Sequence, residues 1–359
     1  MLMRWLAALA AFLATAFIGI VGFGNFTEGI DPELGYDVAG ANSFALILAI
    51  GLVVAFVVYA VTEYAQTRAL TSISRQFDTR TIVLIPIAIA INIILGQAVA
   101  AALKVPIYMD SIGTILVGAL AGPIPGALTG FAANLIWTYV LPAPFHSDFA
   151  APFALVAAVI GLLAGAFSRV GWLRPRPDRT MAQLAAGAAV ALVAVGGLAW
   201  YAYVRFYGEG LDLFGTAENF LFTILQWVVV LVILAAVVGF LGLLFWRRDL
   251  TVAYVVVSGV VTGVIAALIS APISANLFSG VTGSGTDFLV AAFRSAGSSI
   301  QEATFQQGLL SDPIDKLVTF LVVYIILSAM ARRTKARFPQ GERLVEGGGD
   351  DGDWAGSPA

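Results

Sequence analysis

Long apolar segments recur along the whole chain, and they constrain its fold more than any other feature. A helix needs about 20 apolar residues to cross the ~30 Å hydrocarbon core of a bilayer. Of the 359 residues, 60% are hydrophobic and only 11% are charged, whereas soluble domains contain roughly 25% charged residues. The sequence therefore predicts an all-α, polytopic membrane bundle of about ten transmembrane helices. The expected spans are 4–24, 42–65, 82–103, 108–122, 124–141, 150–168, 181–204, 219–246, 251–272 and 313–332.

The basic residues predict how these helices are oriented. Cytoplasmic segments of membrane proteins carry an excess of Lys and Arg. If the N-terminus is cytoplasmic, 15 of the 19 Lys and Arg residues fall in inner segments. The exceptions are Lys104, Arg205, Arg294 and Lys316. We therefore expect a multi-pass protein of the cell membrane, surrounded by lipid, with both termini in the cytoplasm. The segments expected outside are 25–41, 205–218 and 273–312.

The N-terminal segment allows a second interpretation. Arg4, the apolar run and Ala14-Thr15-Ala16 resemble a signal peptide with its cleavage site. The apolar run continues from Phe17 to Val21 without a break, which favours an uncleaved anchor. At the other end, residues 336–359 are acidic and rich in glycine, and we expect a disordered tail there.

A glycine repeat predicts a tight helical hairpin. Gly118, Gly122, Gly126 and Gly130 occur at every fourth position, with Pro123 and Pro125 between them. Small residues at this spacing let helices approach closely in lipid, and the prolines interrupt the helix. The stretch from Asp110 to Gly122 is barely long enough to cross a bilayer. Its outer end is therefore expected to be recessed in a cavity or in a thinned region.

Polar residues gather near that recessed end and form the candidate binding site. Polar side chains at membrane depth are costly unless they face protein or a water-filled cavity. We expect a pocket for a small molecule, in which Trp137 stacks on a ring and amides orient its polar edge. The predicted pocket residues are Gln97, Asp110, Thr114, Asn134, Trp137, Asn276, Gln301 and Glu302. Three alternatives stay open: hydrogen bonds between helices, Trp137 as an interfacial anchor, and Asp110 as the cap of its own helix.

The segment before the last span predicts a cover for this pocket. Over 286–307, Leu289, Phe293 and Ile300 alternate at helical spacing with polar residues. This pattern indicates a single amphipathic helix that is too polar to span the membrane. Asn276 would end the preceding span, and Gln301 and Glu302 would lie on the polar face of the lid.

Several classes of function are excluded by what the sequence lacks. The chain contains no cysteine, and His146 is its one histidine, which argues against disulfides and against a zinc or iron site. It contains no GxxxxGK[ST] motif, so it binds no ATP through a P-loop. We predict no catalytic residues, no metal, no cofactor and no nucleic-acid partner.

Two stretches resemble the substrate-binding S components of energy-coupling factor (ECF) vitamin transporters. They are "INIILGQAVAAALKVPIYMDSIGTILVGALAGPIPGALTGFAANLIW" and "SDPIDKLVTFLVVYIILSAM" followed by "ARR". The resemblance implies a six-helix core, with helices 1–4 in 81–170 and helices 5–6 in 251–335. Residues 1–80 would add two helices in front, and 171–250 would insert another pair. It also implies an extracytoplasmic pocket for a vitamin-like molecule, and partners that supply energy: a transmembrane coupling subunit and two cytoplasmic ATPases.

S components typically dock on the coupling subunit through an Ala-x-x-x-Ala pattern on the first core helix. The equivalent positions here are Ala88, Asn92, Gly96 and Ala100, and Asn92 departs from the pattern. Other readings are a membrane ligand sensor, although no output domain is present in this chain, and a self-powered secondary transporter, although the Pro123–Pro125 break has no partner in a second half. An intramembrane hydrolase is the least favoured, because its signatures are missing from the spans.

Overall fold

The computed structural model describes residues 2–24, 36–98, 108–177, 179–208, 231, 234–235, 237–242, 244–246, 248–295 and 297–345. These residues form helices and contain no β-strand. In chain order the elements are α1 (Leu2–Gly22), α2 (Val38–Thr67), α3 (Thr71–Ser74), α4 (Thr79–Gly96), α5 (Ile112–Ala121), α6 (Pro123–Tyr139), η2 (Ala151–Phe153), α7 (Ala154–Arg169), α8 (Met181–Gly208), α10 (Thr251–Phe278), α11 (Asp287–Ser295), α12 (Ile300–Ala329), α13 (Arg332–Ala336) and η3 (Gly341–Leu344).

Six helices in the described part of the chain are long and apolar enough to cross a membrane. They are α1, α2, α4, η2 together with α7, α8 up to Leu198, and α10. The chain is therefore an all-helical protein with the helices expected of membrane proteins. The helices α5 and α6 are shorter, with 10 and 17 residues, and α12 carries four charged residues. The predicted span over 219–246 lies mostly outside the described residues.

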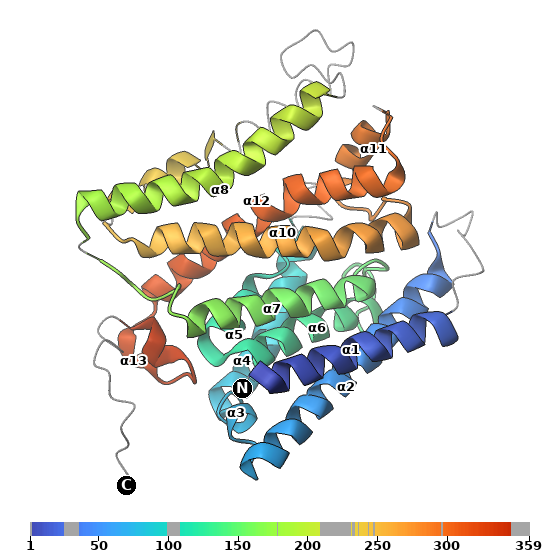
Figure 1. The fold of residues 1–359 in the computed structure, drawn as a ribbon, viewed down its shortest axis with the longest axis horizontal. Helices are drawn as coiled ribbons and strands as arrows, with labels where there is room; N and C mark the ends of the chain where they lie inside the picture. Colours follow the sequence, from blue (N-terminus) through green and yellow to red (C-terminus); the bar gives the residue numbers. More distant parts are fainter. Residues whose placement is uncertain are drawn as a thin grey trace.

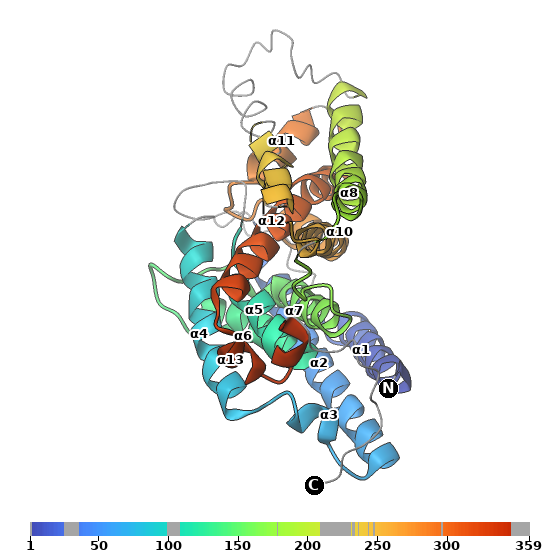
Figure 2. The ribbon, with the colours of Figure 1, turned by 90° about the vertical axis from the view of Figure 1, so that its left-hand side faces the viewer.

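The helices form a bundle with α5 in its interior. Helix α10 packs along α12, α8 packs along α10, and α1 packs along α2 (Figure 1). Helix α5 contacts α4, α6, α7 and α12, and both views place it inside the bundle (Figures 1 and 2). All ten residues of α5 are buried. A helix that is apolar all round and surrounded by protein is a core element rather than a lipid-facing one.

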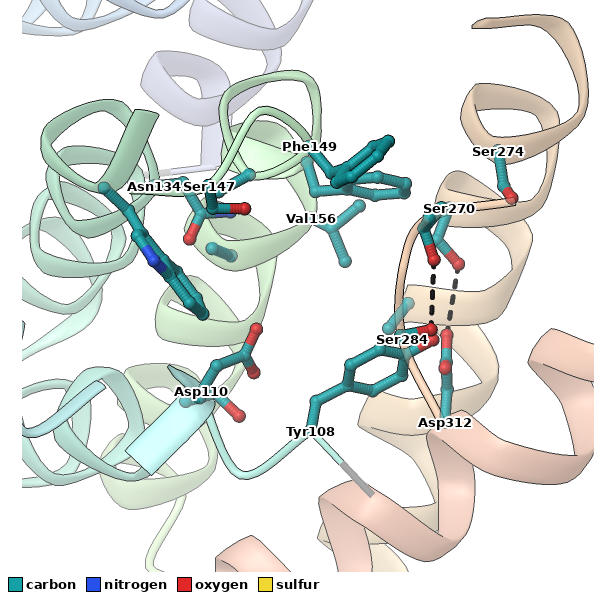
Figure 3. A pocket seen from close by; sticks show the side chains of 18 of the residues that line it. Tyr108, Asp110, Asn134, Ser147, Phe149, Val156, Ser270, Ser274, Ser284 and Asp312 are labelled. Atoms are coloured by element: carbon teal, nitrogen blue, oxygen red, sulfur yellow. Dashed lines mark hydrogen bonds between the residues drawn. The ribbon is translucent and has the colours of Figure 1, made fainter. Parts of the chain in front are cut away.

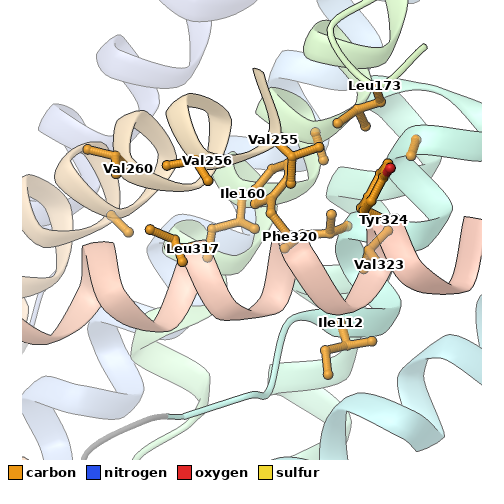
Figure 4. Close-up of a cluster of buried hydrophobic side chains, with 14 of the residues drawn as sticks. Ile112, Ile160, Leu173, Val255, Val256, Val260, Leu317, Phe320, Val323 and Tyr324 are labelled. Carbon is orange, nitrogen blue, oxygen red and sulfur yellow. The ribbon is translucent and has the colours of Figure 1, made fainter. Parts of the chain in front are cut away.

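A branched apolar core joins α10 to α12. Phe320 of α12 is 1% exposed, and Val255 and Val256 of α10 are fully buried. Figure 4 shows these side chains facing one another, with Ile160 of α7 beside them. A Cβ atom at Gly263 would lie 2.2 Å from Pro313 Cα. Glycine therefore lets α10 approach the α12 backbone closely at the proline.

The predicted hairpin between α5 and α6 is present, and α7 completes its packing. Gly122 makes the turn with φ +129, a conformation that favours glycine. A Cβ atom at Gly161 would lie 2.2 Å from the Gly126 backbone, and one at Gly165 would lie 2.3 Å from Pro123 N. The glycine repeat therefore fits against two further glycines on α7, which the sequence analysis did not pair with it.

Most of the described basic residues, with Arg294 and Lys316 as exceptions, are gathered at one end of the bundle, which we call the basic end. Arg4 of α1 donates to Gln66 of α2, and Arg80 donates to the carbonyl of Arg337. Arg343 donates to the carbonyl of Arg169 at the end of α7. We call the opposite end, where α6 ends and α11 lies, the site end. This separation agrees with the expected charge pattern, and the side of the membrane that each end faces stays a prediction.

That prediction can be checked by chemical labelling, because the chain has no native cysteine. Ser74 is exposed at the basic end and Ser295 is exposed at the site end. In intact cells, a maleimide that does not cross membranes should label the Ser295→Cys variant and leave Ser74→Cys unlabelled, because basic segments stay in the cytoplasm. Both variants should react in permeabilised cells. The opposite pattern in intact cells would invert the topology.

The segment before the last span differs from its prediction. The expected helix over 286–307 is divided into α11 and the start of α12, and α12 then continues without interruption through Pro313 to Ala329. The cause is a capping box: Ser299 N donates to Glu302 Oε2 (2.8 Å), and Glu302 N donates to Ser299 Oγ (3.2 Å). A Ser-x-x-Glu pattern of this kind begins a new helix.

Helix ends and the tail also differ from their predictions. Helix α10 extends to Phe278 rather than 272, and α5 begins at Ile112 rather than 108. Residues 336–345, expected in a disordered tail, pack against the basic end, where Gln340 N donates to Leu120 O (2.8 Å) and Leu344 is 1% exposed. The rest of the predicted tail lies outside the described residues.

Candidate binding site

A cavity of about 300 Å³ opens between the α5–α6–α7 hairpin region and the α10–α12 pair. This volume lies at the lower end of the range of roughly 300–1,000 Å³ for small-molecule sites. Figure 3 shows Asp110 and Asn134 on one side of the cavity and Ser270 and Asp312 on the other. The polar lining includes Gln97, Tyr108, Asp110, Ser111, Asn134, Ser147, Ser270, Ser274, Ser284, Gln307, Asp312 and Lys316.

The short length of α5 creates the floor of this cavity. Ten residues span about 15 Å, half of the hydrocarbon core. The chain just before α5 is held at that depth by α12, because Asp315 Oδ1 accepts from Tyr108 N and Met109 N, both at 2.9 Å. Two backbone donors that would otherwise be unpaired inside the bundle are thereby satisfied. The outer end of the stretch from Asp110 to Gly122 was expected to be recessed, and in the structure a cavity lies above it.

A lysine at the floor joins α12 to the start of α5. Lys316 Nζ lies 2.5 Å from Asp315 Oδ2 and 3.5 Å from Asp110 Oδ1, and it donates to Ser111 Oγ (2.9 Å). Lys316 is 4% exposed and Asp315 is fully buried. Buried charges are tolerated when they are paired and hydrogen-bonded, and both of these are.

Asp312 lies one helical turn nearer the site end and has different partners. Its carboxylate accepts from Ser270 Oγ of α10 (3.1 Å) and from Ser311 Oγ (3.2 Å). Its exposure is 6%. Gln307 donates to Ser311 Oγ (2.6 Å). This carboxylate is therefore held by hydroxyl groups and faces the cavity (Figure 3).

Aromatic side chains form the apolar part of the lining. Phe149 and Phe153 line the cavity, and Phe153 stacks on Phe278 with centroids 5.8 Å apart. Trp137 also lines it and is 8% exposed. The indole Nε1 of Trp137 is buried and has no hydrogen-bond partner. A buried donor without a partner is costly, and a ligand acceptor that reached this N–H would remove that cost.

Two loops cover the cavity, in place of the predicted helix. Tyr108 Oη lies 2.7 Å from Thr286 Oγ1 in the loop after α10, and Gln97 donates to the Pro144 carbonyl in the loop after α6 (2.9 Å). A Cβ atom at Gly283 would lie 3.3 Å from the Phe149 ring, so the two loops meet.

The structure brings together four of the eight predicted pocket residues. Gln97, Asp110, Asn134 and Trp137 line the cavity. Thr114 is fully buried beneath it and accepts from Asn92 Nδ2 (2.8 Å). The other three do not line the cavity: Asn276 is exposed and donates to Pro272 O, Gln301 is exposed on the first turn of α12, and Glu302 belongs to the capping box.

The contribution of α12 to the site was not predicted from the sequence. Asp312 and Lys316 lie within one helix among apolar residues, and charged groups at membrane depth are usually functional. Lys316 already stood out as an exception to the basic-residue pattern. The predicted span began at 313 and so left Asp312 in the preceding lid segment, outside the last helix. Its position at membrane depth was therefore not recognised.

The predicted docking row is covered by the chain itself. Ala88 is fully buried and Asn92 is 1% exposed. Asn92 Oδ1 accepts from Gly113 N (2.7 Å), and a Cβ atom at Gly96 would lie 2.5 Å from the Trp137 ring. This face of α4 packs on α5 and α6, so in this structure it is not an open surface for a coupling subunit. Ala100 lies outside the described residues.

Comparison with known proteins identifies no relative. No protein-family model matches the chain, and neither does any curated protein or solved structure. The resemblance to ECF S components therefore stays a prediction, and the cavity is the main structural basis for a functional proposal.

Proposed function

We propose that this protein is the substrate-binding membrane subunit of an ECF-type importer, which captures a small vitamin-like molecule in the cavity beside α5. A coupling subunit and two cytoplasmic ATPases would supply the energy. The observation that carries the proposal is the half-length helix α5, whose N-terminus forms the floor of a polar and aromatic cavity inside a bundle of membrane-type helices.

The shape of the cavity supports binding of a small organic molecule. Its lining combines aromatic rings with a few convergent polar groups, which is the usual composition of ligand sites. Polar residues inside a membrane bundle mark substrate pathways. The two loops that cover the cavity lie at the site end, which the charge pattern predicts to be extracytoplasmic.

A transport experiment tests the proposal. The purified chain is placed alone in liposomes without ATP and without an ion gradient. It should bind its substrate without accumulating it, because binding shifts only a conformational equilibrium. The probes are radiolabelled thiamine, riboflavin, biotin and pantothenate.

A copurification experiment tests the proposed partners. The chain carrying an affinity tag in its native host should copurify with an ATPase and a membrane subunit. Purification of the chain free of any ATPase would contradict the proposal.

The buried charges of α12 favour a second candidate, a secondary transporter driven by an ion gradient. Acidic and basic residues within transmembrane helices commonly form proton or ion relays, and Asp312, Asp315 and Lys316 follow one another along α12. The same liposomes separate the two candidates. Uphill uptake by the chain alone, driven by a proton or sodium gradient, would establish the secondary transporter.

A further inference from the structure

The cavity walls carry an uneven charge. Asp110, Asp148, Asp312 and Lys316 line the cavity, and no arginine does so in the described part of the chain. The Lys316 ammonium is already engaged by Asp315 and Asp110. Asp148 is paired with His146 at the mouth, with the carboxylate oxygen 2.8 Å from Nε2. The acidic groups therefore outnumber the one lysine.

Asp312 is the carboxylate with no cation in contact, because Lys316, one turn along α12, is held by Asp315 and Asp110. Among the described residues no Lys, Arg or His nitrogen lies within 4 Å of it, and its partners are the hydroxyls of Ser270 and Ser311. A carboxylate buried at membrane depth is costly unless a positive charge is near. A positive group brought by a ligand would supply that charge, whereas an anionic ligand would meet two carboxylates, Asp110 and Asp312.

A second and independent feature indicates the rest of the ligand. Trp137 lines the cavity, and its indole N–H, which can only donate, is buried and has no partner. Asn134, close to Trp137 on α6, lies across the cavity from Asp312 (Figure 3). Phe149 and Phe153 add apolar surface between the two sides. The lining thus matches a molecule with a positive group at one end, an acceptor atom at the other, and an apolar body.

We propose that the cavity binds an organic cation whose protonated or quaternary nitrogen contacts the Asp312 carboxylate and whose acceptor atom receives the Trp137 N–H. This inference rests on the proposed function, in that it takes the cavity as the substrate site, and it names the substrate class. Asp312 acts as the counterion, with Ser270 holding one carboxylate oxygen. Lys316 stays with Asp315 and Asp110 and does not contact the positive group.

The test uses the full chain in lipid nanodiscs and two sets of named probes. The cations are thiamine, choline, tryptamine and 1-methylnicotinamide, and the anions are biotin, pantothenate, indole-3-acetate and nicotinate. Two pairs share a ring and differ in charge. Binding is measured by calorimetry and by the rise in melting temperature. At least one cation should bind, and the anion that shares its ring, where there is one, should not.

Variants of Asp312 test whether its charge binds the cation. Asp312→Asn keeps an oxygen that can accept from Ser270 but removes the charge, and it should weaken cation binding by about tenfold or more, since hydrogen bonds to charged groups are the strong ones. Asp312→Glu, which keeps the charge, should recover part of that loss. Glu302→Gln, outside the cavity and still able to cap α12, should leave the affinity unchanged. Gel filtration and melting temperature establish that each variant is folded.

Three results would overturn the inference: binding of an anion, unchanged cation affinity in folded Asp312→Asn, or no binding by any cation. Each of these leaves copurification with an ATPase untouched, so the substrate class can fail while the proposed function stands. Conversely, cation binding that depends on Asp312 in a chain that purifies without an ATPase would support the substrate class and reject the importer.

Discussion

Replacing Lys316 with methionine is expected to lower the free energy of unfolding by about 3–5 kcal/mol. Lys316 Nζ is the cation beside Asp315, which is fully buried and also holds the backbone of Tyr108 and Met109. Removing the ammonium leaves a carboxylate buried without a counterion, and the cost of that state exceeds the value of the pair itself. The start of α5 should loosen together with Asp315.

Denaturation of the purified variant in a titration with a denaturing detergent measures this loss. The double variant Lys316→Met with Asp315→Asn should recover a large part of the stability, because asparagine is neutral and still offers an oxygen to the two backbone N–H groups. Arg75→Met, at an exposed position of the basic end, should change the stability by less than about 0.5 kcal/mol. Equal losses in the single and double variants would show that charge is not the cause.

Gly161→Leu is expected to destabilise the bundle by about 3 kcal/mol or more, at the upper end of the usual cost of overpacking. The added Cβ would lie 2.2 Å from the Gly126 backbone, and backbone atoms on a packed helix cannot turn aside as a side chain can. Helices α6 and α7 would have to separate, and the wall of the cavity that they share would separate with them.

Gly196→Leu on α8 is the matched control for this change. A Cβ atom at Gly196 meets nothing within 4 Å, and the position is exposed on an apolar helix. The same substitution should therefore leave the melting temperature within a few degrees of the parent. The same detergent titration measures the stability of both variants. A similar loss of stability in both would mean that leucine acts through helix propensity rather than through the α6–α7 contact.

The sequence predicted the helices well wherever apolar length and charge were the deciding quantities. The spans that became α1, α2, α7 and α8 have nearly the expected bounds, because apolar length indicates where such segments begin and end. The glycine repeat predicted the α5–α6 hairpin, since close backbone approach is a local requirement. The last span was predicted to begin at 313, whereas α12 continues through Pro313, where Gly263 makes room for the proline within a continuous helix.

The candidate site was less predictable, because its residues meet only through tertiary packing. Residues near the α5–α6 hairpin, such as Asp110 and Asn134, were found from their depth in consecutive spans. Ser270, Asp312 and Lys316 come from the far end of the chain, and their approach to α5 depends on the packing of α12. The alternation of apolar and polar residues over 286–307 placed Gln301 and Glu302 on the polar face of one lid helix. The Ser299 cap instead begins α12 there, which puts both residues on its first turn.

Helix α5 connects the cavity floor to the basic end of the bundle. At one end Ser111 accepts from Lys316 below the cavity, and at the other Leu120 O and the Gly122 turn contact Gln340 of the C-terminal segment. Only about 15 Å separates these contacts, and all ten residues between them are enclosed by protein. A single enclosed helix therefore joins the C-terminal segment to the cavity floor, over half the distance that a full transmembrane helix covers.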